Sequence, residues 1–576
     1  MVHVSALDWL VLLGTTLGIA GYGWWHTRGR KRLDTYLRGA QNTSWITIGL
    51  SVMATQASAV TFLSTPGQGY ADGMRFVQIY FGLPIAMVII AAVFVPLYRR
   101  LNVFTAYEFL GRRFDGKTRL LGAGLFLVQR GIGAGLTIYA PSIVISGVLG
   151  WPLDLTIVFS AILAIIYTVS GGSEAVNVTH RFQMLLIFSG LIVAFFVIVA
   201  SMPRGVTFVD ALHVAGSAGR MKAIDFSPDL NNRYTIWSGI FGGVFLMLAY
   251  FGTDQSQVQR YLSGTSVRES RLGLMFNSIV KVPMQIFILL LGTLVFVYYQ
   301  FEQPPLFFNR AEWRKYTEAP GGDALRKLDD RFVPLHAEEA ARIRDWLAAR
   351  QSGDNAAETK ARAAMTAADG QTRQLRAEAA KALVALDPKA DTKDTDYVFL
   401  TFILDHLPHG VIGLLVAVIF AGGLSSVASE LTALGGTVAV DFYRNLIKPE
   451  ATDAHYVLAS KWFTGLWGVL ILAFALFFQF ADNLIQAVNL LGSIFYGPVL
   501  GLFIVAFFFK RIGGTAVFWG AIASQALVIA VHLFASDKIA FLWYNPIGVG
   551  ACVFFSYVVQ ALPGVSSAQP NASLAA

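Results

Sequence analysis

The chain has 576 residues, of which 55% are hydrophobic and only 14% are charged. A soluble domain carries about 25% charged residues, so this composition excludes an ordinary soluble protein and indicates one that crosses a membrane many times. The net charge of +8 would suggest nucleic acid in a soluble chain, but most basic residues fall in short loops between apolar segments, so no nucleic-acid partner is expected. The single cysteine, Cys552, excludes an internal disulfide framework and thiolate metal cages.

Thirteen apolar segments are long enough to cross about 30 Å of hydrocarbon. They lie near residues 6–25, 44–64, 76–98, 120–149, 152–170, 182–202, 235–261, 273–299, 410–441, 456–480, 483–508, 513–533 and 540–562. Loops rich in Lys and Arg, such as 28–43 and 99–119, are expected in the cytoplasm. This alternation predicts a multi-pass protein of the cell membrane with its N-terminus outside and its C-terminus in the cytoplasm.

The second span carries small and polar residues in its middle. Where a plain anchor would have Leu or Ile, it has Thr55, Gln56, Ser58 and Thr61. Residues that favour helix weakly permit local unwinding, and the freed backbone carbonyls can then line a cavity. We therefore expect this helix to be broken.

The seventh span is also interrupted by a polar residue. Asp254 stands in an otherwise apolar segment, where a charge costs roughly 3 kcal/mol or more unless it faces water or a partner. Two interrupted helices separated by five spans are the mark of a secondary transporter built from inverted repeats, with a binding site at the membrane midplane. The predicted fold class is an all-α polytopic membrane protein with a five-plus-five inverted-repeat (LeuT-like) transporter fold.

Residues 301–396 break the membrane pattern with a stretch rich in Ala, Glu, Lys, Arg and Asp. Apolar residues recur at helical spacing on both sides of Gly353 and Asp354. We expect a charged helical hairpin on the outer face of the membrane, with a disordered loop as the alternative. His336 stands alone in this stretch and is expected to be solvated.

The ninth span contains an adjacent pair of hydroxyls, Ser425 and Ser426, one turn after Gly422 and Gly423. Hydroxyls and bare backbone oxygens at membrane depth suit a small hard cation, because oxygen ligands must replace its water. No net charge is expected beside the pair. The alternative is that the serines pack one helix against another.

The expected organisation has seven parts. Residues 1–43 form the first transmembrane helix and a cytoplasmic basic loop, 44–202 the first inverted repeat, 203–234 an extracellular loop, 235–300 the start of the second repeat, 301–396 the extracellular insertion, 397–533 the rest of the second repeat, and 534–576 the last transmembrane helix and a cytoplasmic tail.

Several motifs stand in a fixed order along these spans. They are Ser51-x-x-Ala54, Gly67-x-Gly69-Tyr70, Gly171-Gly172, Asp254-Gln255 with Gln259-Arg260-Tyr261-Leu262-Ser263, and Ser425-Ser426 with Asp441-Phe442-Tyr443. In these motifs the chain resembles the sodium/solute symporter family, which includes the sodium–sugar, sodium–iodide, sodium–proline and sialic acid cotransporters. The resemblance covers spans two to eleven and is absent from 301–396. It implies the same five-plus-five fold and sodium-coupled import of a small organic solute by alternating access.

The resemblance also implies a sodium site. Its ligands would be the backbone oxygens of Ala54, Ala57 and Gly422 and the hydroxyls of Ser425 and Ser426. Five neutral oxygens suit a monovalent ion better than Ca²⁺, which usually gathers carboxylates.

A departure from the family affects an additional sodium site. His180 stands where many members have Asp, and Ala428 replaces a serine used in the sialic acid relatives. Imidazole is a poor sodium ligand, so we expect one sodium per cycle. His180 itself is either a surface-loop histidine or a gating residue.

The resemblance places solute contacts around the same breaks. The residues implied, or expected to face the same cavity, are Gln56, Ser58, Thr61, Tyr250, Asp254, Lys281, Gln486 and Asn489. Donors and acceptors around one aromatic ring suit a sugar or polyol, whose apolar face can stack while its hydroxyls pair with amides. A monocarboxylate or sugar acid is the alternative, since Lys281 either pairs with Asp254 or attracts a carboxylate.

Other classes are less favoured. A channel needs a continuous pore lined by charges or carbonyls, and a transporter-like sensor needs a signalling domain. An enzyme is not expected, because no nucleophile–base pair or phosphate-binding loop appears. The expected partners are sodium, a small organic solute and the lipid bilayer, and the oligomeric state is left open.

Overall fold

The computed structural model describes residues 5–27, 36–37, 43–388, 390–392, 394–477 and 483–565, and these are almost entirely helical. The first half contains α1 (Ala6–Thr27), α3 (Trp45–Gln56), α4 (Ala59–Asp72), η1 (Gly73–Tyr80), α5 (Leu83–Ile89), η2 (Ile90–Phe94), α6 (Val95–Leu101), α7 (Ala106–Arg113), α8 (Gly116–Leu149), α9 (Leu153–Ala200) and α10 (Phe208–Ser217). The basic cluster at 28–32 and the end of the predicted cytoplasmic tail, from 566 onward, lie outside the described residues.

The second half begins with another pair of short helices. It contains η3 (Ser238–Gly242), α11 (Gly243–Gly252), α12 (Gln255–Leu262), α13 (Val267–Phe301), α14 (Arg310–Thr317), α15 (Asp323–Ser352), α16 (Asn355–Leu386), η4 (Thr395–Tyr397), α17 (Val398–His406), α18 (Val411–Thr437), η5 (Val438–Ile447), α19 (Asp453–Phe477), α20 (Leu484–Phe508), α21 (Gly514–Ala535), η6 (Phe541–Trp543) and α22 (Tyr544–Gln560).

Ten helical stretches in the described part of the chain are long and apolar enough to cross a membrane. Two shorter apolar stretches, Leu153–Val169 and Ser238–Gly252, accompany them. This number is lower than the thirteen predicted spans for two reasons. Breaks leave some helices too short to be counted, and other helices follow one another so closely that they form one stretch, such as Ala59–Leu101.

Both predicted helix breaks are present. The helix that begins at Trp45 ends at Gln56, and Ala57 (φ −85°, ψ 70°) and Ser58 (φ −75°, ψ 174°) separate it from α4. In the second half, α11 ends at Gly252, and the carboxylate of Asp254 caps α12 by accepting the backbone N–H of Ser256. At each break, helix-terminal carbonyls accept hydrogen bonds from other helices: Thr55 from the hydroxyl of Ser426, and Gly252 from that of Tyr98.

One predicted loop is wrong. The spans predicted at 152–170 and 182–202 leave residues 171–181 as a connecting loop, but these residues are helical except at Gly172, where the two parts of the 48-residue α9 meet at a kink. A straight helix of that length would measure about 72 Å, far more than the membrane needs. Gly172 supplies the bend, because its φ of 60° and ψ of −167° are poorly accessible to other residues. His180 consequently lies inside a helix.

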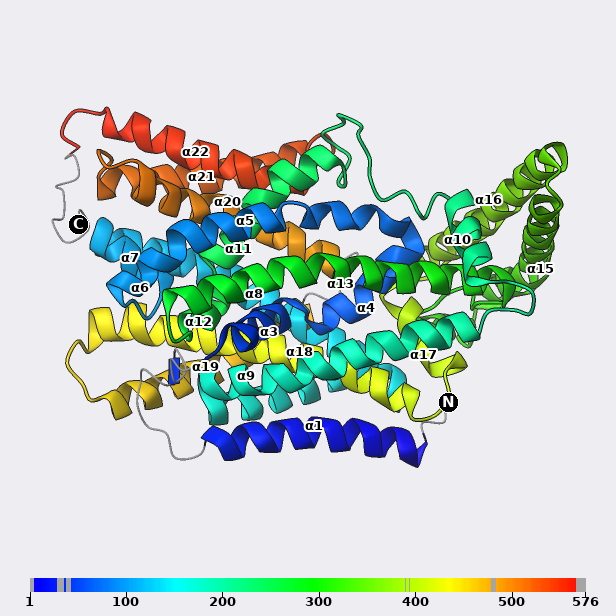
Figure 1. Ribbon diagram of the computed structural model, residues 1–576, viewed down its shortest axis with the longest axis horizontal. Helices are drawn as coiled ribbons and strands as arrows, with labels where there is room; N and C mark the ends of the chain where they lie inside the picture. The colour runs from blue at the N-terminus through cyan, green and yellow to red at the C-terminus, as the bar shows by residue number, and fades with distance from the viewer. Residues whose placement is uncertain are drawn as a thin grey trace.

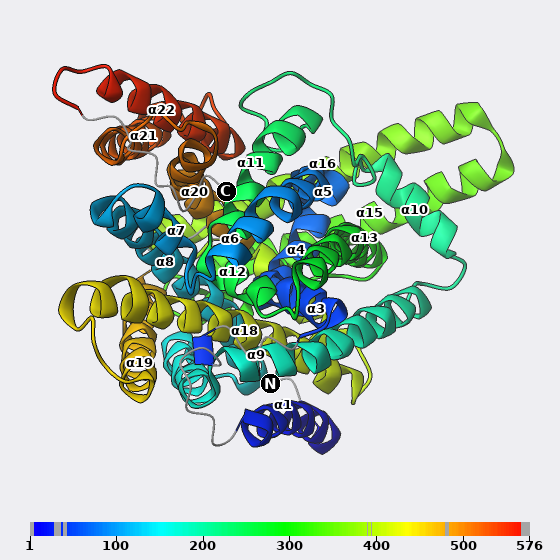
Figure 2. The ribbon, with the colours of Figure 1, turned by 60° about the vertical axis from the view of Figure 1, so that its left-hand side comes forward.

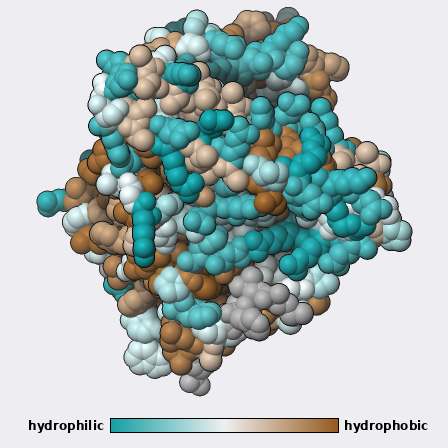
Figure 3. Space-filling model, turned by 90° about the vertical axis from the view of Figure 1, so that its right-hand side faces the viewer, coloured by the Kyte–Doolittle hydropathy of each residue, from teal (hydrophilic) through white to brown (hydrophobic). Residues whose placement is uncertain are grey.

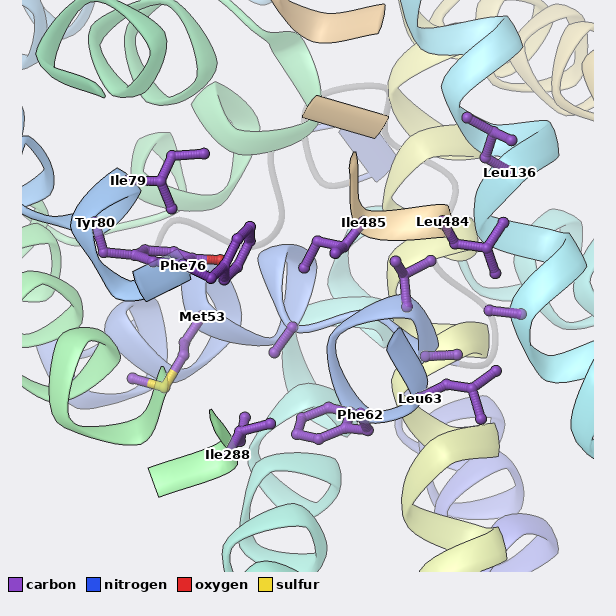
Figure 4. Close-up of a cluster of buried hydrophobic side chains, with 14 of the residues drawn as sticks. Met53, Phe62, Leu63, Phe76, Ile79, Tyr80, Leu136, Ile288, Leu484 and Ile485 are labelled. Carbon is purple, nitrogen blue, oxygen red and sulfur yellow. The ribbon is translucent and has the colours of Figure 1, made fainter. Parts of the chain in front are cut away.

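The broken helix α3–α4 occupies the centre of the apolar core. Figure 4 shows Phe62 and Leu63 of α4 among the buried side chains around the break, with Ile288 of α13 close to Phe62. Gly69 allows α13 to approach closely, since a Cβ there would lie 2.4 Å from the carbonyl oxygen of Leu289. Small residues permit this kind of contact between helices within a membrane.

Residues 310–386 form a projecting unit. The long helices α15 and α16 pack against each other as an antiparallel pair, joined at Gly353 (φ 72°), and project from one end of the bundle (Figures 1 and 2). Figure 3 shows that this end of the molecule is predominantly hydrophilic. His336 is not solvated as expected: it is buried, and its Nε2 atom lies 2.8 Å from the carbonyl oxygen of Tyr299 on α13.

Different segments lie at the two ends of the bundle. Figure 1 shows the first residues of α1 at the end that carries the α15–α16 pair, while the last residues of α22 lie at the opposite end with α6 and α7. In both ribbon views α1 and the pair α21–α22 lie at opposite margins of the bundle. The core of the helix bundle therefore lies between them.

Candidate ion and solute site

A cluster of oxygens forms where α18 crosses the break of α3. The hydroxyl of Ser426 donates to the carbonyls of Ala54 (3.3 Å) and Thr55 (3.0 Å). The hydroxyl of Ser425 lies 3.5 Å from the carbonyl oxygen of Ala54 and donates to that of Gly422 at 2.9 Å. Two hydroxyls of one helix thus face the freed carbonyls of another.

The fifth oxygen of the predicted set lies at the same crossing. A Cβ on Gly422 would lie 3.2 Å from the carbonyl oxygen of Ala57, so the two backbones approach closely there. The side chains around this crossing are buried. A further hydrogen bond, 3.1 Å between the hydroxyls of Thr55 and Ser429, also links α3 to α18. The structure therefore joins four of the five predicted oxygens by these contacts and places the fifth, the carbonyl of Ala57, close to the backbone of Gly422.

His180 lies directly beside this cluster. Its Nδ1 atom is 2.9 Å from the hydroxyl of Ser51, and its Nε2 atom is 3.4 Å from the carbonyl oxygen of Ser425. The Ser51 hydroxyl also donates to the side-chain oxygen of Asn177, which accepts from Arg260 as well. The interpretation of His180 as a surface-loop histidine is wrong, because its side chain is fully buried.

A cavity of about 90 Å³ opens beside the break. Its lining residues come from α3, α4, η1, α8, α11, α18 and α20, and are Thr55, Gln56, Ser58, Val60, Thr61, Tyr80, Arg130, Thr137, Leu246, Met247, Tyr250, Glu430, Ile485, Val488, Asn489 and Tyr496. Figure 4 shows two of them, Tyr80 and Ile485, near the broken helix. The mixture of apolar walls, aromatic rings and a few polar groups is typical of a small-molecule site.

Of the predicted solute contacts, five line the cavity and three do not. Gln56, Ser58, Thr61, Tyr250 and Asn489 are lining residues. Gln486 lies nearby on α20, where it bonds Arg233 and Gln68.

The other two predicted contacts are separated from each other. Lys281 is fully buried on α13, and its ammonium has no hydrogen-bond partner in the described structure. It lies 6.0 Å from the ring centre of Tyr80, which lines the cavity. Asp254 is paired with Arg130 instead of Lys281.

Arg130 and its partners form a buried charge cluster at the cavity wall. The guanidinium reaches Asp254 through both Nε and Nη2, donates from Nη2 to the hydroxyl of Tyr496 at 2.7 Å, and contacts Glu430 Oε1 from Nη1 at 3.1 Å. It also lies 5.3 Å from the ring centre of Tyr250. Three helices, α8, α18 and α20, and the break before α12 are thereby held together.

Sequence reasoning missed Arg130 and Glu430. Both are ionisable residues within apolar spans, a pattern that marks functional positions in membrane proteins. Glu430 lies one helical turn after Ser426, so the expectation that no net charge lies beside the serine pair is wrong. A search of each span for single charges would have found both residues.

The fold and the site define the class of this protein: two broken helices, an oxygen cluster at one of the breaks and a cavity lined by residues of both helices are the features of a secondary transporter. A family model described as the sodium:solute symporter family matches residues 36–303 and 377–524. The chain belongs to this family, and sodium is its coupling ion. The unmatched stretch between the two segments falls largely within α14, α15 and α16.

Curated relatives extend over most of the chain. The sodium/iodide cotransporter of Homo sapiens is 26% identical over 543 residues, covering 92% of this chain and 70% of the relative. The sodium-dependent multivitamin transporter of Oryctolagus cuniculus is 28% identical over 516 residues, covering 88% and 67%. The sodium-coupled monocarboxylate transporter 1 of Homo sapiens is 32% identical over 273 residues, covering 47% and 44%. All are transporters, which points away from an enzyme.

Among solved structures, the chain is similar to a Na⁺-coupled sialic acid symporter in a substrate-bound, outward-open state. The two share 22% sequence identity with a TM-score of 0.75, and the match covers 98% of this chain and 99% of the other. This likeness shows that both chains have the same fold.

Proposed function

We propose that this sodium-coupled symporter imports a sugar or polyol by alternating access, with its N-terminus and the α15–α16 pair outside the cell and its C-terminus in the cytoplasm. The observation that carries the proposal is the adjacency of ion and solute groups on one broken helix. Gln56 and Ser58, which line the cavity, are interleaved with Ala54 and Ala57, whose carbonyls belong to the oxygen cluster. An ion that orders this break also orders the solute groups.

Sodium is proposed to bind at the backbone oxygens of Ala54, Ala57 and Gly422 and the hydroxyls of Ser425 and Ser426. In the described structure the Ser425 and Ser426 hydroxyls donate to carbonyls of the same cluster. Sodium would replace those donations, because a hydroxyl can turn its lone pairs towards a cation and its hydrogen elsewhere. Five neutral oxygens hold a monovalent ion without a carboxylate.

The solute is proposed to lie against Tyr250 and to exchange hydrogen bonds with Gln56, Ser58, Thr61 and Asn489. A sugar or polyol fits this set, since an aromatic face accommodates its C–H groups while amides and hydroxyls pair with its hydroxyls. Gln56 has spare capacity for such a bond, because its Oε1 atom is buried with no partner in the described structure. Asp254 is proposed to act on the solute indirectly, by fixing Arg130.

A monocarboxylate or sugar acid is the second candidate. A guanidinium, that of Arg130, lines the cavity, and one of the relatives is named as a monocarboxylate transporter. Arg pairs with carboxylates in bidentate geometry when its donors are free. This candidate therefore depends on whether Arg130 can release one of its present partners.

Uptake into proteoliposomes tests the proposal. The purified full-length protein is reconstituted, an inward sodium gradient is imposed, and radiolabelled sugars, polyols and monocarboxylates are compared with choline in place of sodium. Saturable, sodium-dependent uptake of a sugar or polyol is expected. Sodium-dependent uptake of carboxylates alone would refute the proposed solute class, and unsaturated sodium flux without any solute would indicate a channel.

A further inference from the structure

We propose that Glu430 is the charge link between the sodium site and the solute cavity. Its carboxylate makes the sum of the charges on Arg130, Asp254, Glu430 and one sodium ion zero, and it therefore selects a solute that brings hydrogen-bond donors and no negative charge. The inference rests on the proposed function, because it assigns the charge of the solute that the same cavity would bind.

Glu430 lines the cavity and has a carboxylate oxygen without a hydrogen-bond partner in the described structure. The side chain is only 4% exposed and belongs to the cavity lining. Its Oε1 atom accepts from Arg130 at 3.1 Å and from Thr137 at 3.4 Å, whereas Oε2 is buried and has no hydrogen-bond partner in the described part of the chain. A buried carboxylate oxygen without a donor is costly, so a hydroxyl or ammonium of the solute would be stabilised there.

Arg130 is already saturated with anions. Each of its three guanidinium nitrogens bonds a carboxylate, Nε and Nη2 at Asp254 and Nη1 at Glu430. A solute carboxylate would be the third anion around one cation in an apolar, largely buried setting. Like charges so arranged repel strongly, and the excess negative charge would have no compensating group. The cavity therefore disfavours the carboxylate solutes that Arg130 alone would attract.

Sodium completes the charge balance. With both carboxylates ionised, Arg130, Asp254 and Glu430 carry a formal charge of −1, and one sodium ion brings the total to zero. Glu430 follows Ser426 by four residues on α18, so the two side chains lie on one helix face with their Cβ atoms about 5–6 Å apart. Sodium at the serine pair is then attracted by the carboxylate, and the same attraction disappears if the carboxylate is neutralised.

Sodium affinity in the absence of solute provides the first test. The full-length protein in detergent is titrated with NaCl at constant ionic strength while its thermal unfolding is followed. Glu430→Gln should weaken apparent sodium affinity by about tenfold, whereas Glu430→Asp, which keeps the charge, should stay within about threefold of wild type. The control is Glu358→Gln, the same change on α16 at the Arg350 ion pair, and it should leave sodium affinity unaltered. Wild-type sodium affinity in Glu430→Gln would overturn the proposal.

Charge selectivity provides the second test and uses wild type as well. Glucose, glucosamine and glucuronate share one ring and differ in charge. Their competition for sodium-dependent uptake therefore measures the effect of solute charge. Wild type should accept glucose or glucosamine at least tenfold better than glucuronate, and Glu430→Gln should reduce this ratio at least fivefold. If Glu430→Gln does not fold, the wild-type ratio alone decides, and a preference for glucuronate overturns the inference.

The two proposals fail in different ways. If the transported solute is an uncharged or cationic compound that is neither a sugar nor a polyol, and Glu430→Gln weakens sodium affinity, the sugar or polyol assignment is wrong and the role of Glu430 stands. If wild type prefers a carboxylate, both proposals are overturned. If a neutral sugar is transported and Glu430→Gln changes neither sodium affinity nor selectivity, the proposed function stands and this inference is overturned. Absence of sodium-dependent uptake for every solute tested would overturn both.

Discussion

The Nδ1 atom of His180 lies 2.9 Å from the hydroxyl oxygen of Ser51, so an imidazole joins α9 to the first half of the broken helix. Its other ring nitrogen lies 3.4 Å from the carbonyl oxygen of Ser425 on α18. Three helices around the proposed sodium site therefore meet at one buried side chain. An imidazole in this position supplies contacts between helices but no anionic oxygen for a second sodium ion.

The first prediction concerns sodium stoichiometry. The family resemblance implies oxygen ligands for an additional sodium ion at the positions of His180 and Ala428, and neither residue has a side-chain oxygen. Sodium-dependent uptake should therefore show a Hill coefficient near one. The measurement is initial uptake against sodium concentration in proteoliposomes, combined with the ratio of charge to solute. A Hill coefficient approaching two, or two charges per neutral solute, would contradict this prediction.

The second prediction concerns the serine pair. Ser425→Ala or Ser426→Ala removes one of about five oxygen ligands, which should weaken apparent sodium affinity by roughly 1–3 kcal/mol. Solute affinity at saturating sodium should change less, because the lining residues are untouched. Sodium titrations of thermal stability and of uptake both measure the effect.

Ser556→Ala is a matched control for this pair. Ser556 is also a buried helical serine whose hydroxyl bonds a backbone carbonyl, that of Cys552, but it lies on α22 at the margin of the bundle. It should leave sodium dependence unchanged. Wild-type sodium dependence in both Ser425→Ala and Ser426→Ala would show that the ion binds elsewhere.

The sequence predicts the helical fold and the positions of both helix breaks. Polar residues of weak helix propensity at Thr55 and Ser58, and a carboxylate at Asp254, indicate where apolar helices are interrupted, and the structure interrupts them there. The bend at Gly172 could not be told from a loop, because a single glycine with positive φ leaves no other local signal. Chain continuity through such a bend is decided by packing against neighbouring helices.

The site was only partly predictable. Local sequence identifies groups on broken helices, such as Gln56 and Ser425, because their polarity contrasts with the apolar segment around them. Which charges meet depends on the three-dimensional arrangement: the sequence offers Lys281 as a partner for Asp254, but α8 brings Arg130 to Asp254 instead. The pairing of residues 124 positions apart cannot be read from either segment alone.

The third prediction separates the cavity from its surroundings. Tyr250 lines the cavity, with Arg130 against its ring and Gln257 bonded to its hydroxyl at 2.7 Å. Tyr250→Ala should weaken solute binding by roughly 1 kcal/mol or more and leave sodium affinity nearly unchanged. Lys281→Gln should have little effect on a neutral solute, since Lys281 does not line the cavity.

Competition assays at saturating sodium measure both variants. A large loss of neutral-solute binding in Lys281→Gln, with Tyr250→Ala unaffected, would move the solute site towards α13. A loss confined to a carboxylate solute in Lys281→Gln would instead support the second candidate, because only that solute loses a charge partner.

The last prediction concerns the α15–α16 pair, which lies outside the membrane-spanning segments. Glu339 on α15 is 1% exposed, accepts a hydrogen bond from the Thr372 hydroxyl on α16 at 2.7 Å, and has a second oxygen with no partner in the described structure. Burial raises the pKa of Glu339 from its ordinary value of 4.5 to about 7. The folded pair therefore favours the protonated carboxyl.

The sign of the pH dependence follows from this shift. Below about pH 4.5 the Glu339 carboxyl is protonated in both the folded and the unfolded state and does not lower the stability of the pair. As pH rises towards 7 the carboxyl ionises first in the unfolded state, so the free energy that holds the pair together falls by up to roughly 3 kcal/mol. Hydrogen exchange of α15 and α16 amides in the full-length protein, corrected for intrinsic rates, should show lower protection at pH 8 than at pH 5.5. Glu339→Gln stays neutral and should lose most of this pH dependence, while Glu338→Gln, its exposed neighbour, should keep it. Equal pH dependence in Glu339→Gln and wild type would show that another group controls the packing of the pair.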